Sequence, residues 1–495
     1  MAISMAGLVH ADDAVYAIDL PTALRLAKAE NNRIKVARER ITEAEARLDK
    51  AKLSLIPDLS IGASIYRHDG PLQETNGKIL DINRSASQAG LGAGATGAGN
   101  ATVPGISIQT DLADTFFDPL AAKQNLTAVR ADLLDQRLDT LLNVAHAYYE
   151  LLRAKSHFAV AQESLQNANE LYNTTSSFAQ SGEGLESDVA RAAVEQLVYQ
   201  RNMERARESA LVNSIELARL LRLDPTTQLE PHANRAVPVD FVANCDSVSA
   251  LIVTALENHP SIERESALVS VASTQLRKAE NAVLIPSVAV SSSLGTFLGG
   301  QGSTLNSSGD RADINAVVYW ELQNFGLGDR ADTKMQRSIL NQQMVEELDA
   351  MDRLAAEVAT ARAMVVSRSR QVDIGERAIE RGRTAYQLNR TRIFENQGLP
   401  VEALQAISAL DVAGRLYVDA VIDYNKAQYS LFTALGQPCT DTVDVEEIII
   451  RVEEQTAPMA ASRPITAQPV ETETKSNQTT GIFSKIFQPK SKSVD

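Results

Sequence analysis

The chain has 495 residues, a formal charge of −15 at pH 7 and only 5% aromatic residues. A chain of this length can bury a large core. Its acidic balance argues against nucleic acid as a partner, because phosphates require a basic surface, and no basic cluster with interleaved aromatics is present. Many alanines, leucines, glutamates and glutamines favour long helices that pack through narrow seams.

The first eleven residues resemble the last part of a secretory signal. Small residues, Val9 and Ala11, stand before two aspartates, as they do at a cleavage site. A basic segment is missing and the apolar stretch is short, so an unstructured N-terminus is the alternative interpretation.

The same landmarks occur twice along the chain, in the same order. The segment LDKAKLSLIPDLSI (residues 48–61) recurs as LRKAENAVLIPSVAV (residues 276–290). In both copies a charged helical stretch reaches a proline, which ends the helix, and then becomes β-prone. Similar strand-to-helix junctions, glycine turns and helix ends follow in each copy. We therefore predict a tandem duplication, with repeat 1 over 18–230, a linker over 231–246 and repeat 2 over 247–438.

Repeat 1 is predicted to contain one helix, two strands and two long helices. Their ranges are 20–56 for the first helix, 58–67 and 104–113 for the strands, and 119–180 and 185–223 for the long helices. Apolar residues three or four apart, from Leu126 to Leu152, predict a coiled-coil-like seam. A helix from Pro119 to Gln180 would run roughly 90 Å at 1.5 Å per residue, which suits a duct or a rod.

Repeat 2 is predicted to follow the same plan. Its ranges are 261–285 for the first helix, 287–295 and 312–322 for the strands, and 329–396 and 400–436 for the long helices. The stretches 85–100 and 299–309 are rich in glycine, serine or asparagine and are expected to be exposed loops. The tail over 441–495 is dominated by polar residues and proline after Gln455, so most of it is expected to be disordered.

The predicted strands alternate apolar with small or polar residues over about ten positions, which is typical of a transmembrane barrel. An ordinary soluble hairpin is the alternative. Tyr66, Tyr319 and Trp320 stand near strand ends, where aromatic girdles form. Four strands cannot close a barrel, because open edges in lipid leave backbone groups unsatisfied. Strands in lipid therefore require oligomerisation, and three copies give about twelve strands.

Taken together, the duplicated Ile-Pro helix stop, the segment from Trp320 to Gly326 and the glycine turns at Gly182 and Gly398 resemble the outer-membrane efflux protein family, the TolC-like channels. The resemblance covers roughly residues 18–438. It implies a mainly α protomer with short β strands. Three such protomers would form an α-helical periplasmic barrel joined to a 12-stranded transmembrane β-barrel, with four strands per protomer.

The resemblance also implies a function and partners. The chain would be the exit duct of a tripartite export system, of the kind used by efflux pumps and type I secretion. It would act as a passive homotrimer in the lipid of the outer membrane, with its helices in the periplasm. A periplasmic adaptor protein, working with an inner-membrane pump, would open the helical tips. A soluble acidic coiled-coil scaffold or tether is the rival interpretation.

The same resemblance points to three groups of residues. The adaptor-docking turns would contain Gly182, Gly184, Leu185, Gly398 and Leu399, within the tips 181–188 and 396–405. The strand–helix turns would contain Pro57, Pro286, Phe117, Pro119, Phe325 and Gly326. The channel gate would contain Asp188, Arg191, Glu402 and Gln405.

The gate chemistry stays open at this stage. Glu402 and Asp188 match acidic positions of the family, whereas Gln405 and Arg191 stand at the later positions. Threefold symmetry would bring three Glu402 carboxylates together, and such a ring attracts cations. Equally, Glu402 is a solvated residue near a helix start, where the helix dipole favours an acid.

Catalytic and cofactor chemistry finds no support in the sequence. The histidines are scattered, and there is no HExxH, Walker loop or GxSxG motif, so we predict neither an enzyme nor a cofactor or metal site. Cys245 and Cys439 lie far apart without CxxC spacing, which also argues against a metal or redox centre. Whether they form a disulfide stays open.

Overall fold

The computed structural model describes residues 15–91, 106–232, 236–242, 247–395 and 398–436. The signal-like segment 1–11, both cysteines and the tail 441–495 lie outside these residues. The chain divides into two compact units. The first unit contains residues 1–37, 133–260 and 351–495, and the second contains residues 38–132 and 261–350. Each unit takes segments from both sequence repeats, so the repeats are not separate compact domains.

Both repeats open with a pair of helices and a 3₁₀ turn before the proline. In repeat 1 these are α1 (Leu20–Glu30), α2 (Asn32–Lys52) and η1 (Leu53–Leu55). In repeat 2 they are α5 (Val248–Asn258), α6 (Pro260–Asn281) and η2 (Ala282–Leu284). The single helix expected over 20–56 is therefore wrong, because Asn31 leaves helical geometry with ψ at 131°. Its side chain then accepts from the Arg33 amide at 2.8 Å, which starts α2.

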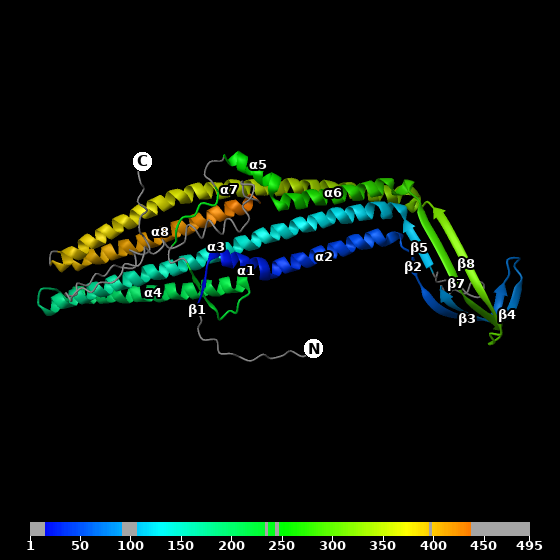
Figure 1. Cartoon of the computed structure of the whole chain (residues 1–495), viewed down its shortest axis with the longest axis horizontal. Helices are drawn as coiled ribbons and strands as arrows, with labels where there is room; N and C mark the ends of the chain where they lie inside the picture. Colours follow the sequence, from blue (N-terminus) through cyan, green and yellow to red (C-terminus); the bar gives the residue numbers. More distant parts are fainter. Residues whose placement is uncertain (1–14, 92–105, 233–235, 243–246, 396–397, 437–495) are drawn as a thin grey trace, which may run out of the picture. The chain divides into compact units, whose positions relative to one another are not determined.

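Two long helices follow the strands in each repeat. They are α3 (Leu112–Gln180) and α4 (Glu186–Leu221) in repeat 1, and α7 (Leu327–Phe394) and α8 (Pro400–Ala434) in repeat 2. Figure 1 shows α3 with α4, and α7 with α8, as helical hairpins. The corresponding helices differ by one residue in length, at 69 and 68 residues and at 36 and 35 residues. None of the described helices combines the length and the apolar character needed to cross a membrane.

The start of α3 corrects two expected turn residues. Phe117 and Pro119 lie inside α3 and not at a strand–helix turn. The helix begins at Leu112, where the Asp111 carboxylate accepts from the Ala113 amide at 2.9 Å. Pro119 removes one backbone donor from the helix, but the good helix formers that follow it, Leu120, Ala121 and Ala122, favour its continuation.

Most of the strands form one antiparallel sheet in the second unit, to which both repeats contribute strands. Its members are β2 (Asp58–Leu59), β3 (Ile61–Gln73), β4 (Ile79–Leu91), β5 (Ile106–Asp111), β7 (Ser287–Gln301) and β8 (Ser307–Tyr319). One edge of β7 pairs with β5 and β4, which lie end to end, and its other edge pairs with β8. Only one residue separates β2 from β3, so these two strands follow one another in a single row. The sheet therefore has four rows of strands side by side: β2/β3, β5/β4, β7 and β8.

This sheet differs from the expected strands in several places. The stretch expected as a loop from residue 85 is the second half of β4 as far as Leu91, and residues 92–100 lie outside the described part. Similarly, β3 continues to Gln73, β7 to Gln301, and β8 starts at Ser307. Small residues are typical of loops, whereas in this sheet they allow the strands to approach closely. A Cβ on Gly295 would lie 2.4 Å from the Ala89 carbonyl oxygen, which leaves room only for glycine.

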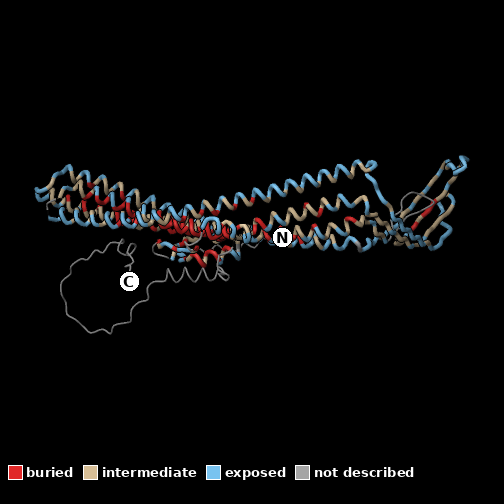
Figure 2. Tube along the Cα trace, turned by 90° about the horizontal axis from the view of Figure 1, so that it is seen from above, coloured by how far each residue is buried: buried red, intermediate tan, exposed pale blue. Residues whose placement is uncertain are grey.

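The main hydrophobic core lies in the first unit, where α1, α3, α4, α7 and α8 pack together. Figure 2 shows buried residues concentrated along these helices, whereas the strands carry few. A short parallel pair, β1 (Val15–Ile18) with β6 (Gln228–Pro231), contributes residues to this core. Ile18 and Leu229 from this pair are both almost fully buried.

The described part of the linker, residues 236–242, has no regular secondary structure and is held by buried amide side chains of α8. Asn425 accepts from the Val239 amide and donates to the Val237 carbonyl, both at 2.8 Å. One turn along α8, Gln428 accepts from the Val242 amide at 3.1 Å. Phe241 packs edge-on against Tyr429. The linker between the repeats is therefore bound to the last helix through its backbone.

We expect Asn425→Ala to speed hydrogen exchange at the Val239 amide by about tenfold or more. The substitution leaves a buried donor without its acceptor, at a cost of about 1–3 kcal/mol. The Leu229 amide, which donates to Ser214 Oγ at 2.7 Å, serves as an internal control and should keep its rate. Equal protection of Val239 in the variant would show that Asn425 does not hold the linker.

Candidate functional site

The turn between α3 and α4 is built around glycines. After α3 ends at Gln180, Gly182 adopts a left-handed φ of 83°, which glycine reaches without strain. The amides of Glu183 and Gly184 both donate to the Phe178 carbonyl, at 2.9 and 3.0 Å. A Cβ on Gly184 would lie 3.0 Å from the Ala179 nitrogen, so this position is also tight. Leu185 then caps α4 in extended geometry.

The turn between α7 and α8 ends in the same way. Leu399 precedes α8 with φ −88° and ψ 136°, close to the −96° and 136° of Leu185 before α4. Pro400 fixes the first helical residue, and Gly398 packs against Arg392 and Ile393. The side chains of Leu185 and Leu399 are 66% and 61% exposed. Each turn thus presents one uncovered leucine just before its second helix; Asn396 and Gln397 lie outside the described residues.

The expected gate residues are not joined to one another. Glu402 lies in the first turn of α8 and forms an ion pair with Arg392 of α7 at 3.0 Å. Gln405 and Arg191 are exposed, and Asp188 is partly exposed in the first turn of α4. No hydrogen bond or ion pair links these four side chains among the described residues. Within one chain, the Glu402 carboxylate is therefore already neutralised by a guanidinium.

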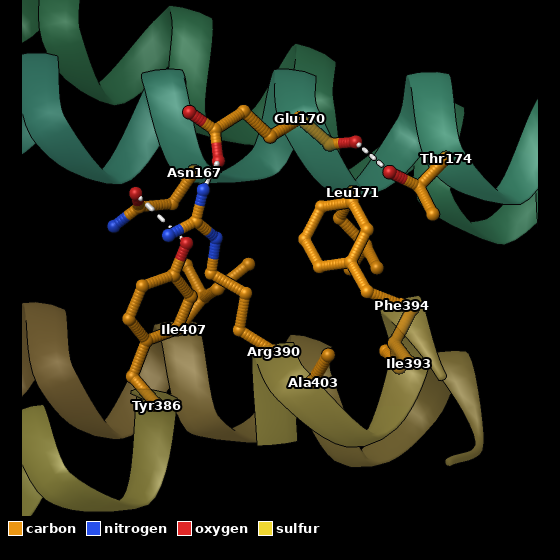
Figure 3. A pocket seen from close by; sticks show the side chains of 10 residues that line it. All are labelled: Asn167, Glu170, Leu171, Thr174, Tyr386, Arg390, Ile393, Phe394, Ala403 and Ile407. Atoms are coloured by element: carbon orange, nitrogen blue, oxygen red, sulfur yellow. Dashed lines mark hydrogen bonds and ion pairs between the residues drawn. The ribbon is translucent and has the colours of Figure 1, made fainter. Parts of the chain in front are cut away.

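Two polar contacts near this end of α7 were missed at the level of sequence. Figure 3 shows that Tyr386 and Arg390 of α7 reach across to α3. The Tyr386 hydroxyl donates to Asn167 Oδ1 at 3.0 Å, and the Arg390 guanidinium lies 3.2 Å from a Glu170 carboxylate oxygen. Arg390 also stacks over the Phe394 ring at 5.5 Å. The spacing of four between residues 386, 390 and 394 is the signal that could have revealed this shared helix face.

Burial favours the protonated form of the Tyr386 hydroxyl. Burial, followed by the nearby Glu170 carboxylate, raises the pKa of Tyr386 to about 12. The hydroxyl therefore stays a hydrogen-bond donor to Asn167 at any physiological pH. The cavity among these side chains has a volume of only about 20 Å³. Ligand pockets usually hold about 300–1,000 Å³, so these residues are better explained as ties between helices.

The sheet of the second unit has two chemically different faces. Directly paired residues share a face, and successive residues alternate between faces. One face, called here the apolar face, carries mainly aliphatic side chains in the half of the strands next to the helices: Leu59, Ile61, Ala63, Ile65, Ala89, Leu91, Ile106, Ile108, Val288, Val290, Leu294, Ala312, Ile314, Ala316 and Val318. Toward the turns that join β3 to β4 and β7 to β8, the same face carries polar and charged side chains, among them Arg67, Asp69, Asn83 and Asp310. Ile65 and Ile314 on this face are 81% and 82% exposed.

The opposite face, called here the polar face, carries mainly polar and small side chains: Ser64, Tyr66, His68, Arg84, Ala86, Gln88, Ser107, Gln109, Ser287, Ala289, Ser291, Ser293, Gly295, Phe297, Arg311, Asp313 and Asn315. Tyr66 packs with Ala86 and Phe297 on this face. Tyr66 is therefore not part of an aromatic girdle on the apolar face.

Both outer rows of the sheet keep a free edge. Within the described residues, β8 pairs only with β7, and β3 pairs only with β4. The outward backbone donors and acceptors of these 13-residue strands need partners from beyond the described residues or from solvent.

Exposed aromatic side chains gather where the strands meet the helices. Trp320 follows β8, and Phe325 occupies the turn η3 (Gln323–Gly326) before α7. The turn needs three successive positive φ values, of 49° at Asn324, 57° at Phe325 and 82° at Gly326. Phe325 is fully exposed, and Phe116 in the first turns of α3 is 68% exposed. Pro57 and Pro286 lie at the corresponding ends of η1 and η2.

A group of three or more histidine, cysteine, aspartate or glutamate side chains that could hold a metal ion does not occur in the part of the chain that the structure describes. The ion pairs of the helices instead join neighbouring elements. In the first unit, for example, Arg368 pairs with Asp423 at 2.9 Å, and Lys426 pairs with Glu150 at 2.6 Å.

Comparison with known proteins gives a consistent picture. Residues 23–221 match the family model described as "Outer membrane efflux protein". No curated protein sequence is similar enough to be counted as a relative. The predicted resemblance is thus confirmed by a match that covers nearly all of repeat 1.

Solved structures of outer-membrane channels share the fold. The Campylobacter jejuni CmeC outer membrane channel superposes with a TM-score of 0.71 at 16% identity, covering 89% of this chain and 90% of that one. The Vibrio cholerae outer membrane protein VceC gives 0.68 at 16%, covering 85% and 97%. The open state of the Neisseria gonorrhoeae MtrE channel gives 0.66 at 19%, covering 84% and 89%. The predicted fold class, mainly α with short strands, is confirmed.

We expect Tyr386→Phe to loosen the end of α7 from α3, because Asn167 loses its donor at a cost of about 1 kcal/mol. Amide exchange in the last turns of α7 should speed up about fivefold. Tyr172→Phe is the matched control, since the Tyr172 hydroxyl has no partner among the described residues. If amide exchange in the last turns of α7 is unchanged in Tyr386→Phe, the hydrogen bond to Asn167 does not hold α7 to α3.

The pH dependence of this tie follows from the raised pKa of Tyr386, about 12 against about 10 for a free phenol. Its stabilisation is complete below about pH 10 and is lost as the pH rises through about 12. Amide exchange at the end of α7 should therefore rise in that window in the native chain and not in Tyr386→Phe.

Proposed function

We propose that the chain, which matches the outer membrane efflux protein family over residues 23–221, is the outer-membrane exit duct of a tripartite export system. Three copies would form a passive channel that carries small molecules or proteins from the periplasm to the exterior. A periplasmic adaptor, working with an inner-membrane pump, would open the duct at the helical turns.

The two-faced sheet with free edges is the observation that carries this proposal. An exposed aliphatic face on one side and a polar face on the other is what a barrel wall needs between lipid and water. A soluble scaffold has no use for such a face, since exposed apolar patches invite aggregation. In lipid, the free edges of β3 and β8 must be paired, because unsatisfied backbone groups cost several kcal/mol each.

Closure by copies of the same chain meets this requirement. The edge of β8 in one protomer can pair with the edge of β3 in the next, because both strands have 13 residues. Such a heterologous contact closes into a ring. With four rows per chain, three protomers give a barrel of about twelve strands. The number three comes from the family and is part of the proposal.

The exposed aromatic side chains at the strand–helix junction support the same orientation. Trp320, Phe325 and Phe116 are exposed where the apolar face ends. Tryptophan favours the boundary between lipid and water, because its ring combines apolar surface with a polar N–H, and the two phenylalanines add apolar surface beside it. We therefore assign this junction to the periplasmic surface of the outer membrane, with the long helices extending into the periplasm.

The two turns with exposed leucines are the proposed docking site of the adaptor. Leu185 and Leu399 have nearly equal backbone geometry and exposure. The duplication thus presents two similar apolar contacts per protomer, or about six around a trimer. A partner with a repeated apolar contact of its own would fit them.

The contacts of Tyr386, Arg390 and Arg392 near the second turn are the proposed closing ties. They hold α7 to α3 through Asn167 and Glu170, and α7 to α8 through Glu402. An outward movement of α7 and α8 away from α3 would break the first two. The adaptor's binding energy must therefore exceed the free energy of these ties.

Insertion and pore formation test the channel itself. Purified protein should migrate as a trimer that resists sodium dodecyl sulfate and should give discrete conductance steps in planar bilayers. We expect Ile314→Lys on the apolar face to reduce insertion, because a lysine in lipid costs about 2–4 kcal/mol. Asn315→Lys, its neighbour on the polar face, should insert normally. A chain that stays soluble and monomeric without detergent would overturn the proposal.

Adaptor docking is tested by Leu185→Ser combined with Leu399→Ser. Each leucine would become buried against the adaptor, which stabilises the complex by about 1.5–3 kcal/mol. Loss of both contacts should abolish cross-linking to the adaptor and export in cells. Leu348→Ser is the control, because Leu348 has a similar exposure of 60% but lies elsewhere on α7. Conductance of the purified double variant should be unchanged. Normal export by this variant would place the adaptor elsewhere.

A further inference from the structure

Two cationic side chains lie directly opposite one another on the polar face of the sheet. His68 of β3 is paired with Arg84 of β4, and Gln301 of β7 continues the same row beside Arg84. The flanking rows contain no charge, with Gly70 and Ile82 on one side and Tyr66, Ala86 and Gly299 on the other.

One nitrogen of each side chain is buried and lacks a hydrogen-bond partner among the described residues. Neither Nε2 of His68 nor Nε of Arg84 makes a hydrogen bond within the described residues, although both atoms are shielded from solvent. A guanidinium has five N–H donors, and a buried donor without an acceptor costs about 1–3 kcal/mol. Like charges directly across two strands add repulsion when the imidazole is protonated. An acceptor that carries negative charge would remove both penalties.

No carboxylate of the neighbouring described strands fills this role. Asp69 is adjacent to His68 in sequence but lies on the opposite face, where its carboxylate is 3.9 Å from Arg67. On the polar face of β8, Asp313 already pairs with Arg311 at 2.8 Å. Nε of Arg311 on this face thus has a carboxylate partner, whereas Nε of Arg84 has no hydrogen-bond partner among the described residues.

We propose that His68, Arg84 and Gln301 form an anion-binding site on the polar face of the sheet, suited to oxyanions of the phosphate class. A guanidinium can donate two parallel hydrogen bonds to such an anion. The imidazole and the amide of Gln301 supply further donors from the same row. A carboxylate offers fewer acceptor oxygens, so it should bind more weakly.

Binding needs only the strands of one chain, whereas the role of the site in transport rests on the proposed function. If the polar face lines the lumen, three such sites form a cationic belt in the barrel. A belt of this kind would favour the passage of solutes with phosphate groups over cations. The location on the polar face argues for a water-soluble anion and against a lipid headgroup.

Isothermal titration of the purified protein in a non-ionic, phosphate-free detergent with inorganic phosphate tests the site. We expect saturable binding that Arg84→Gln weakens at least tenfold and His68→Gln weakens less. Arg311→Gln removes the same charge from the same face and is the matched control, which should bind phosphate as the native chain does. Acetate should compete poorly, and vesicles of phosphatidylglycerol should not compete.

Three results would overturn the proposal: no saturable binding, equal loss in Arg84→Gln and Arg311→Gln, or effective competition by the lipid. Retention of the detergent-resistant oligomer shows that each variant is folded. If Arg84→Gln fails this check, Arg84→Lys keeps the charge and should still weaken binding several-fold by losing the paired hydrogen bonds. Bilayer conductance is recorded separately, so that a failed site and a failed channel are distinguished.

Discussion

The backbone groups along the edges of β3 and β8 set the strongest physical demand in this protein. Each strand has one row of donors and acceptors that no described residue pairs. In water such groups are hydrated, but beside lipid they must find partners or cost several kcal/mol each. The aliphatic face of the same sheet, with Ile65 and Ile314 uncovered, is equally unsuited to water. Under the proposed function, both demands are met together when copies of the chain close the sheet in a membrane.

The duplication explains why one chain brings two helical hairpins, yet the two are not held alike. Leu185 and Leu399 enter their helices with almost the same backbone geometry. The first hairpin is closed by a hydrogen bond from Gln196 of α4 to Asn169 of α3 at 2.8 Å. The second is closed by the ion pair of Arg392 with Glu402, and Tyr386 and Arg390 also join it to α3. Each of these ties is worth about 1 kcal/mol, so they can be broken singly by a docking partner. The repeats are therefore similar in fold and different in energetics.

Much of this architecture could be predicted from sequence, because local signals decide it. Proline before the strands, glycine in the turns and apolar spacing along the helices each act within a few residues. The order of elements and the mainly helical class follow from these signals. The start of α3 is an exception, because Phe117 and Pro119 resembled a boundary while the Asp111 cap had already begun the helix.

The features that could not be predicted from the sequence depend on contacts between residues that are far apart along the chain. The second half of β4 is rich in small residues and has the composition of a loop, but β3 and β7 pair with it on both sides. The hydrogen bond between Tyr386 and Asn167 joins residues 219 positions apart, and no local pattern marks Asn167. The hydrogen bonds by which Asn425 holds the linker likewise cannot be predicted without the fold. Single-residue contacts at long range were missed for this reason.

The ion pair of Glu402 changes how a charged constriction should be considered. A ring of three free carboxylates would repel itself and attract cations. Here each carboxylate already faces the Arg392 guanidinium at 3.0 Å, so a ring would carry compensated charge while α7 and α8 keep this geometry. Any cation selectivity at this level would have to appear when the pair separates. Both side chains are partly exposed, so solvent screening keeps the cost of separation small, at about 1 kcal/mol or less. Opening the helical turns could then expose the carboxylates at the same moment as it widens the path, which would couple the charge of the constriction to its width.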